Sequence, residues 1–328
     1  MIPTISTESD LDALRRSAHG FAAVSAWSGA GLFDALAEKG ALSPQEMSAD
    51  PRAIEITAPI LAHLGLLTGD GKRWMLSQSG QRLHASGALH LGSADSNLGD
   101  LSRLDKVMLD GGPAPGPDDT PRLTDIGVQT EDPEAARQFM EFLHRRSGDS
   151  AEVVSHWLSP RLRPGARILD LGGGHGRYGS TLARQGFQVT LFDLPVCIQF
   201  AKERYGDSLN YISGDFMQDD LGGPFDGILI SNIIHGLGLE ENRQLLKRIK
   251  AALSPGGTLL LKDMFLDDSE IGPETAVFFG LLMLLYTRHG RCYSVHEMNA
   301  LCQQTGLGPI EHIRVPDEGF SLLFSAAE

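Results

Sequence analysis

The chain has 328 residues, of which 41% are apolar, and its formal net charge is −14 at pH 7. This length allows two domains with separate hydrophobic cores, while the negative charge disfavours a surface that binds nucleic-acid phosphates. The three cysteines are widely separated and odd in number, which does not fit a disulfide framework. No apolar run reaches the roughly 18 residues of a membrane-spanning helix. We therefore expect a soluble, cytoplasmic protein that binds neither nucleic acid nor membrane.

The first hundred or so residues predict short helices followed by a small hairpin. Residues 7–10 (TESD) resemble a capping box before an amphipathic run, and residues 21–37 carry apolar side chains spaced for one helix face. A second apolar helix is predicted over residues 54–64, and two short strands flank a Gly-Asp-Gly turn within residues 66–76. This is a winged-helix pattern. Its candidate recognition helix, residues 51–64, is almost without basic side chains, so a dimerisation platform is favoured over DNA binding.

A proline- and glycine-rich loop at residues 111–119 interrupts the helical pattern, and a long helix is predicted to follow it. Asp132 is a suitable N-cap, with proline and glutamate in the first turn after it. We expect this helix to run through Phe139, Leu143 and Ser147 and to bridge the two halves of the chain.

From residue 167 onward, strand-like and helical segments alternate, which predicts a parallel sheet covered on both faces. The expected strands are residues 167–171, 188–192, 209–212, 227–231 and 258–262. The tail differs, because residues 310–315 and 320–325 are joined by a short turn like a hairpin. The last strand is therefore expected to be antiparallel.

Residues 167–176 (RILDLGGGHG) predict a buried strand that runs into a glycine-rich turn. The glycines permit a tight turn and let a ligand approach the main chain. The next two strands end in Asp193 and Asp215, and the carboxyl ends of parallel strands lie at one edge of a sheet. We expect Asp193 to accept the hydroxyls of a ribose, and Asp215 and Phe216 to bind and stack on an adenine.

Two cofactors contain these groups. Gly174-x-Gly176-x-x-Gly179 matches the dinucleotide pattern, and Asp193 lies where an acid that binds the NAD ribose belongs. That pattern alone is weak evidence. The acid and aromatic pair after the third strand and the antiparallel tail favour S-adenosylmethionine (SAM), with S-adenosylhomocysteine (SAH) as the product.

With these residues in view, the chain resembles the plant-type and bacterial small-molecule O-methyltransferase family. The resemblance rests on residues 169–176, 192–195, 214–216, 231–235 and 253–257. It implies a Rossmann-like α/β domain of class I SAM methyltransferases, with a seven-stranded mixed sheet whose last strand is antiparallel. It also implies a mostly helical, winged-helix-like N-terminal domain through which homodimers form. The resulting division is a dimerisation domain at 1–105, the loop and bridging helix at 106–150, and the SAM-binding catalytic domain at 151–328.

The resemblance makes His235 the general base, and an imidazole titrates in the range suited to removing a hydroxyl proton. The family usually places Asp and Trp after this histidine and a glutamate later that orients it. Here the following residue is Gly236, and Cys292 falls at the glutamate's position, where it cannot orient an imidazole as a carboxylate does. Ser231 replaces a commonly basic residue near the methionyl end of SAM, so Arg177 or another group is expected there.

Three readings of the chemistry follow. The acceptor atom is a hydroxyl oxygen with His235 as base, or a carbon, sulfur or nitrogen atom that needs only proximity, or the chain binds SAM without catalysis. The cofactor site is expected to contain Asp170, Gly172, Gly174, Gly176, Asp193, Leu194, Asp215, Phe216 and Ser231.

The acceptor, a small molecule, is expected between the bridging helix, residues 278–286 and His235. Its predicted contacts are Phe139, Leu143, Arg146, Phe279, Met283, Tyr286 and Thr287. A carboxylate on the acceptor would be bound by inward-facing guanidinium groups among Arg145, Arg146, Arg288 and Arg291. No metal site is expected, because the histidines lack the paired spacing of metal ligands.

Overall fold

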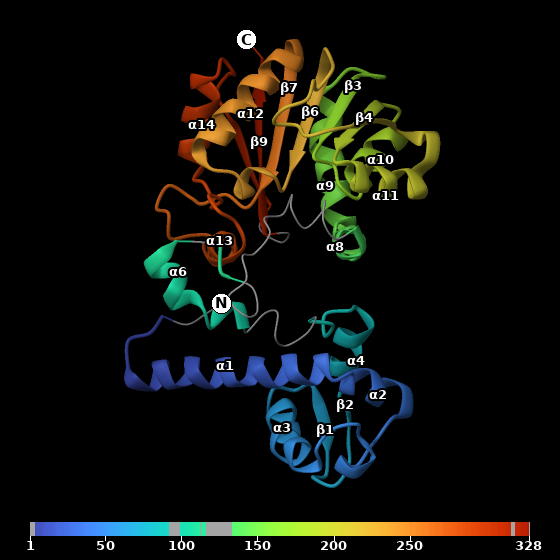
Figure 1. The fold of residues 1–328 in the computed structure, drawn as a ribbon, viewed down its shortest axis with the longest axis vertical. Coiled ribbons are helices and arrows are strands. Elements are labelled where there is room, and N and C mark those ends of the chain that lie inside the picture. Colours follow the sequence, from blue (N-terminus) through green and yellow to red (C-terminus); the bar gives the residue numbers. More distant parts are fainter. Residues whose placement is uncertain (1–3, 92–98, 112, 116–132, 316–318, 328) are drawn as a thin grey trace. The chain divides into compact units, whose positions relative to one another are not determined.

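The computed structural model describes residues 4–91, 99–111, 113–115, 133–315 and 319–327 (Figure 1). The chain divides into two compact units, Met1–Asp105 and Lys106–Glu328. No helix within the described ranges is long and apolar enough to cross a membrane. Each unit has its own hydrophobic core, and each is described by itself below.

The N-terminal unit combines helices with a two-stranded wing. Its elements are α1 (Glu8–Gly29), α2 (Leu32–Lys39), the 3₁₀ helix η1 (Pro44–Glu46), α3 (Pro51–His63), β1 (Leu67–Gly69), β2 (Trp74–Leu76) and α4 (Gln78–Ala85). The predicted capping box is confirmed, since the Thr7 hydroxyl accepts from the Asp10 N–H and the Asp10 carboxylate accepts from the Thr7 N–H. The predicted hairpin is confirmed as well, with Leu67 opposite Leu76.

The apolar run at residues 21–37 belongs to two helices rather than one. The chain turns between α1 and α2, where Gly31 has a φ of 66°, a conformation that glycine adopts without strain. The expected face still forms one core, because Trp27, Leu32 and Leu36 are all buried in the same cluster. Helical spacing therefore predicted the burial correctly and missed the turn.

The C-terminal unit is built on the seven-stranded mixed sheet that the sequence predicts. Its strands are β3 (Arg167–Leu171), β4 (Gln188–Asp193), β5 (Asn210–Ser213), β6 (Phe225–Ser231), β7 (Leu253–Asp263), β8 (Glu311–Val315) and β9 (Phe320–Ala326). Their order in the sheet is β5-β4-β3-β6-β7-β9-β8, and β9 runs antiparallel to both of its neighbours. The predicted antiparallel last strand is confirmed, which does not fit the parallel sheet of the dinucleotide-binding alternative.

Helices cover both faces of this sheet. They are α9 (Gly148–Leu158), α10 (Arg177–Arg184), α11 (Pro195–Tyr205), α12 (Leu239–Ala252) and α14 (Val295–Gln304). The unit also contains α8 (Pro133–Arg146) and α13 (Glu274–Tyr286), while α6 (Leu104–Asp110) crosses the boundary between the units. Figure 1 shows α12 and α14 on one side of the sheet and α9, α10 and α11 on the other. The predicted bridging helix ends at Arg146, one residue earlier than expected, because Ser147 separates α8 from α9.

The two faces of the sheet bury separate clusters of side chains. Successive residues of a strand point to opposite faces. In β7, Leu259 and Leu261 accordingly pack in one cluster with α12 and α14, and Leu260 packs in the other with α9 and α10. This alternation is important for the site, because it decides which face each residue at the end of a strand points to.

Leu260→Ala is expected to destabilise the C-terminal unit by about 2–5 kcal/mol, because it leaves a cavity at a fully buried position on a central strand. Urea unfolding followed by circular dichroism would measure the loss. Leu239→Ala is the matched control, since Leu239 is 43% exposed at the start of α12. An equal loss in both variants would contradict this assignment of the core.

Candidate functional site

The site begins where the strand order reverses. From β3 the chain continues to β4 on one side and later returns to β6 on the other, so β3 and β6 flank a switch point. Open α/β sheets bind ligands at the carboxyl ends of such strands. The glycine-rich turn, residues 172–176, follows β3 directly at this place.

Three glycines of this turn adopt backbone conformations that other residues rarely take. The φ angles of Gly172, Gly174 and Gly176 are 68°, 48° and 74°. A Cβ atom on Gly172 would lie 2.7 Å from Ile233 Cδ1, and one on Gly174 would lie 3.2 Å from Met140 Sδ. The turn therefore forms a cradle of bare backbone that a side chain would fill, which suits close approach of a ligand.

Two predicted cofactor residues, Asp170 and Asp193, hold this turn from either side. Asp170 is fully buried beneath it and accepts the Gly179 N–H at 2.9 Å, and its burial raises the pKa of this carboxyl to about 7. Asp193 accepts the Gly174 N–H through Oδ2 and the Leu194 N–H through Oδ1, each at 2.7 Å. The Cys197 thiol donates to the same carboxylate, which leaves one of its four acceptor sites for a ribose hydroxyl.

The loop after β5 brings the expected aromatic ring to the glycine turn. Phe216 is half-buried, and its Cε1 atom lies 3.7 Å from the place of a Cβ on Gly172. Asp215 accepts from the Met217 N–H and the Gln218 side-chain amide, each at 2.8 Å. The structure thus places Phe216 beside the cradle, while the Asp215 carboxylate is hydrogen-bonded to the two residues that follow Phe216. Their contacts with adenine stay predictions.

A histidine and an aspartate meet at the ends of β6 and β7. His235 lies in the short 3₁₀ turn after β6, and its Nδ1 is 2.6 Å from Asp263 Oδ1, which is almost fully buried at the last position of β7. Burial favours the neutral carboxyl of Asp263, but His235, the Met264 N–H and the charge of Lys262 together outweigh it and hold this pKa below its usual value. A carboxylate only accepts, so the hydrogen in this bond belongs to Nδ1 and a neutral His235 presents the lone pair of Nε2.

Sequence reasoning missed Asp263 and was wrong that His235 lacks a carboxylate partner. Cys292, which sequence alignment puts at the family's glutamate position, is buried, and its burial together with the charge of Asp263 raises the pKa of this thiol to about 12. It is therefore neutral. One feature of the sequence could have indicated Asp263 as the partner. The apolar run of β7 ends in Lys262 and Asp263, and β7 is the neighbour of β6, the strand that precedes His235.

Helix α13 packs against this pair of residues from one side. The ring of Phe279 meets the His235 imidazole edge-on, with 4.8 Å between the ring centroids. Met283 is buried and Tyr286 is half-buried on the same helix. The hydroxyl of Thr287 donates to the Met283 carbonyl at 2.7 Å and closes the end of the helix. Of the predicted acceptor contacts, Phe279 is thus the one placed directly on the imidazole in the described chain.

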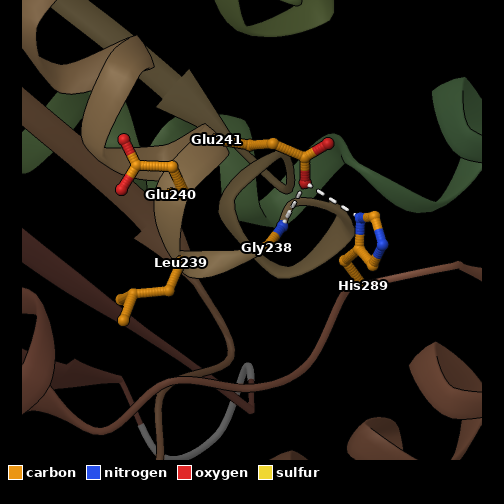
Figure 2. Close-up of a pocket in the computed structure, with 5 residues that line it drawn as sticks. All are labelled: Gly238, Leu239, Glu240, Glu241 and His289. Carbon is orange, nitrogen blue, oxygen red and sulfur yellow. Dashed lines mark hydrogen bonds and ion pairs between the residues drawn. The ribbon is translucent and has the colours of Figure 1, made fainter.

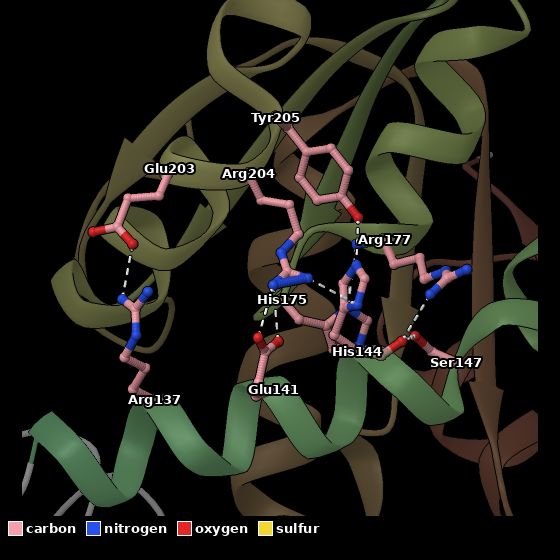
Figure 3. A network of polar contacts seen from close by, with 9 residues as sticks. All are labelled: Arg137, Glu141, His144, Ser147, His175, Arg177, Glu203, Arg204 and Tyr205. Carbon is pink, nitrogen blue, oxygen red and sulfur yellow. Dashed lines mark hydrogen bonds and ion pairs between the residues drawn. The ribbon is translucent and has the colours of Figure 1, made fainter. Parts of the chain in front are cut away.

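Figure 3 shows the hydrogen bonds and ion pairs that connect α8 to α10 and α11. The Arg204 guanidinium of α11 donates twice to Glu141 of α8 at 2.9 Å, and His144 Nε2 lies 2.8 Å from the Tyr205 hydroxyl. Arg177, at the first turn of α10, donates to the His144 carbonyl at 3.0 Å. These contacts hold α8 against α10 and α11, so that Met140 can sit against the cradle.

The remaining predicted acceptor residues lie on α8. Phe139 is 47% exposed, and Leu143 packs on a small cluster formed by Met140, Cys197 and Phe200. Arg146 is exposed, with its guanidinium over the Phe142 ring. Among the other arginines, Arg291 pairs with Glu297 at 2.7 Å, while Arg145 and Arg288 are exposed.

A separate open pocket of about 440 Å³ lies at the start of α12 (Figure 2). Its lining residues are Gly238, Leu239, Glu240, Glu241 and His289. Glu241 accepts the Gly238 N–H and lies 3.6 Å from His289 Nδ1. The lining is acidic and contains neither the glycine turn nor an aromatic ring from β5, so it does not suit a nucleoside.

The cradle, the buried Asp193 and the His235 and Asp263 pair all lie along one edge of a mixed sheet with the strand order of methyltransferases. The residues present fit SAM, since a turn of bare backbone lies against a buried carboxylate, which are the groups that the sequence predicts for binding its ribose. Fold and site together define a class I SAM-dependent methyltransferase.

Comparisons with known proteins agree with this class. A model of the O-methyltransferase domain matches residues 123–308. The 3-hydroxy-5-methyl-1-naphthoate 3-O-methyltransferase of Streptomyces sahachiroi is 28% identical over 306 residues, which cover 88% of this chain and 86% of that protein. The N,N-dimethyltransferase OxyT of Streptomyces rimosus is also 28% identical, over 308 residues that cover 84% of this chain and 83% of that protein. Human N-acetylserotonin methyltransferase, solved in complex with SAM, shares the fold with a TM-score of 0.78 at 20% identity and 99% coverage of both chains.

The matched domain exceeds half of the chain, so the protein belongs to the O-methyltransferase domain family. It is an enzyme, a SAM-dependent methyltransferase, as the sequence predicts.

Asp193→Asn is expected to weaken SAH binding by at least tenfold, because the amide has one acceptor oxygen where the carboxylate has two charged ones. Isothermal titration calorimetry would measure the change. Asp226→Asn is the control, since Asp226 also accepts a backbone N–H, from Arg167, but at the opposite end of the sheet. Equal affinity of both variants for SAH would remove Asp193 from the cofactor site.

Proposed function

We propose that the enzyme transfers the methyl group of SAM to a hydroxyl oxygen of a small aromatic acceptor, with His235 as the general base. The observation that carries this proposal is the 2.6 Å contact between His235 Nδ1 and the buried Asp263 carboxylate. It fixes both the tautomer and the orientation of the imidazole, which are the two properties that a histidine base requires.

The proposed reaction is an in-line displacement, for which SAM supplies an electrophilic methyl group on a positively charged sulfur. His235 Nε2 removes the hydroxyl proton while the acceptor oxygen forms its bond to the methyl carbon. The carbon–sulfur bond breaks, and its electron pair stays on sulfur, which leaves neutral SAH. Asp263 stabilises the imidazolium that results, because it is a buried charge at hydrogen-bond distance. Holding the acceptor in line behind the sulfonium supplies much of the acceleration.

An aromatic acceptor is supported by the side chains around His235. Phe279 presents a ring to the imidazole, and α13 is apolar on all sides of the helix. The Streptomyces sahachiroi relative acts on a hydroxynaphthoate, an aromatic hydroxyl compound that also carries a carboxylate. We propose the acceptor contacts as Phe139, Leu143, Arg146, Phe279, Met283, Tyr286 and Thr287, with Thr287 shaping the turn because its hydroxyl is already bonded to the backbone.

The cofactor is proposed to lie across the carboxyl ends of β5, β4, β3 and β6. Adenine stacks on Phe216 near Asp215, and the ribose is bound by Asp193. The sulfonium lies over the glycine turn at β3, a short distance from His235 after β6. The proposed set is Asp170, Gly172, Gly174, Gly176, Asp193, Leu194, Asp215, Phe216 and Ser231, in which Asp170 acts by ordering the turn from beneath.

Asp263→Asn and His235→Ala are each expected to lower kcat/KM for hydroxyl acceptors about 10²- to 10⁴-fold, and the double variant little further, because the two residues act as one unit. Transfer of labelled methyl to a panel of phenols, hydroxynaphthoates and amines would test this. Glu241→Gln, at the start of α12, is the control and should retain activity.

Full activity of His235→Ala would contradict general-base catalysis on oxygen. Label found only in amine products would point to nitrogen transfer, the activity named for OxyT. Neither result would affect cofactor binding, which the asparagine variant of Asp193 tests separately.

We also propose that the protein is a homodimer formed through its N-terminal unit in a reducing, cytoplasmic compartment. Three large apolar residues of α1 (Leu11, Leu14 and Phe21) are each 40% exposed or more. Covering such residues by a second copy of the chain is favourable. All three cysteines lie in the described residues, are buried and form no disulfide, which suits a reducing compartment.

Light scattering coupled to gel filtration is expected to give twice the chain mass of 35.4 kDa, and Leu14→Arg to shift the population toward monomer. Leu83→Arg is the control, since Leu83 is similarly exposed but lies on α4. A wild-type protein that elutes as a monomer at micromolar concentration would contradict the proposal.

A further inference from the structure

A buried lysine lies one residue before the end of β7. Lys262 is 5% exposed, and it is paired in register with Ser231, the last residue of β6. Paired residues of neighbouring strands point to the same face. This face carries Leu260 and Phe320, whereas Asp263, one residue further on, points to the opposite face and bonds His235.

The groups that contact the Lys262 ammonium are uncharged, and the Asp263 carboxylate, which is paired with His235, acts on it only at longer range. Its Nζ donates to Asn232 Oδ1 at 2.9 Å and lies 4.4 Å from the centre of the Phe320 ring and 6.0 Å from that of Tyr178. Among the described residues, no carboxylate forms an ion pair with it. Buried charges in proteins are normally paired, so an ammonium with spare N–H donors in this position calls for an anion.

A second donor without a partner lies beside it. The Ser231 hydroxyl oxygen is buried and has no hydrogen-bond partner in the described chain. Between the two, Asn232 has a φ of 58°, which is uncommon for a residue other than glycine and is found at functional sites. This conformation holds the Asn232 side-chain oxygen at Lys262 Nζ. Lys262 and Ser231 together offer donors suited to one carboxylate.

The order of the strands indicates which carboxylate this is. Adenine is proposed at Asp215 after β5 and ribose at Asp193 on β4, so the rest of SAM extends over β3 toward β6 and β7. The part of SAM beyond its sulfur is an amino acid, and Ser231 and Lys262 are the paired residues at those strand ends.

We propose that Lys262 and Ser231 bind the amino-acid carboxylate of SAM, with the lysine supplying the positive charge from β7. The inference rests on the proposed placement of the cofactor but not on the role of His235. Arg177 is the competing cation, yet its guanidinium is bonded to the His144 carbonyl and packs on Gly148 at the junction of α8 and α9.

The test compares two ligands by calorimetry, SAH and 5′-methylthioadenosine, which has the same nucleoside and sulfur but lacks the amino acid. Lys262→Met is expected to weaken SAH binding about 10- to 100-fold and to leave methylthioadenosine binding unchanged. Ser231→Ala should weaken SAH binding by a smaller factor with the same selectivity. Lys247→Met, at an exposed position of α12, is the control and should change neither affinity.

Thermal unfolding of each variant would establish that it is folded, and Ser231→Ala provides the test if Lys262→Met is not. Equal weakening of both ligands would overturn the proposal and make Lys262 a packing residue. Selective loss of SAH binding in Arg177→Met, with Lys262→Met unaffected, would overturn it in favour of Arg177.

The acceptor is the other source of a carboxylate, and a further arm separates the two. The binding of 3-hydroxy-2-naphthoate and of 2-naphthol would be measured in SAH-loaded protein. Lys262→Met is expected to have the same effect on both affinities. Selective loss of the naphthoate with SAH affinity intact would overturn the cofactor assignment. A wild-type protein that binds neither SAH nor methylthioadenosine would overturn the proposed function together with this inference, whereas absent methyl transfer with intact selectivity would contradict only the function.

Discussion

The parallel pairing of β6 with β7 is the constraint on which the rest of the site depends. Its register places Ser231, the last residue of β6, beside Lys262 of β7. Asp263, the next residue of β7, then lies alongside the loop after β6 that carries His235. A slip of one residue would exchange the faces of Lys262 and Asp263. The ammonium would then lie against the imidazole and the carboxylate would lie beneath the cofactor, which would reverse both electrostatic arrangements.

Two adjacent residues with opposite charges can therefore perform opposite tasks within one small volume. The sheet itself separates them, since one points into the layer of α12 and α14 and the other into the layer of α9 and α10. The carboxylate is neutralised by a group of the protein, His235. Among the described residues, the ammonium contacts a neutral amide and two rings and feels the charge of Asp263 only at longer range, and in the proposed arrangement a carboxylate of the ligand pairs with it. Burying an unpaired charge costs stability, and a bound carboxylate offsets that cost.

The glycine turn depends on its surroundings in the same way. Positive φ angles let the turn expose its backbone, but its position follows from Asp170 beneath it, Asp193 beside it and α8 in front of it. The polar contacts of Glu141 and His144 with α11 hold α8 there. A nucleoside site is thus assembled from four segments of the chain, of which only the turn has a recognisable local pattern.

The sequence by itself determined the class of fold, the strand order's antiparallel ending, the glycine turn, the acids that end the strands, and His235. These features are local, because periodicity, turn chemistry and strand ends are written within a few residues. Only the tertiary structure decided that Asp263 rather than Cys292 faces the imidazole, that Arg177 is bonded to the backbone of α8, and that Lys262 lies buried next to the Ser231 hydroxyl. Each of these depends on the register between strands or on packing between distant helices. Segments that meet across such distances in the chain leave no spacing from which the contact can be read.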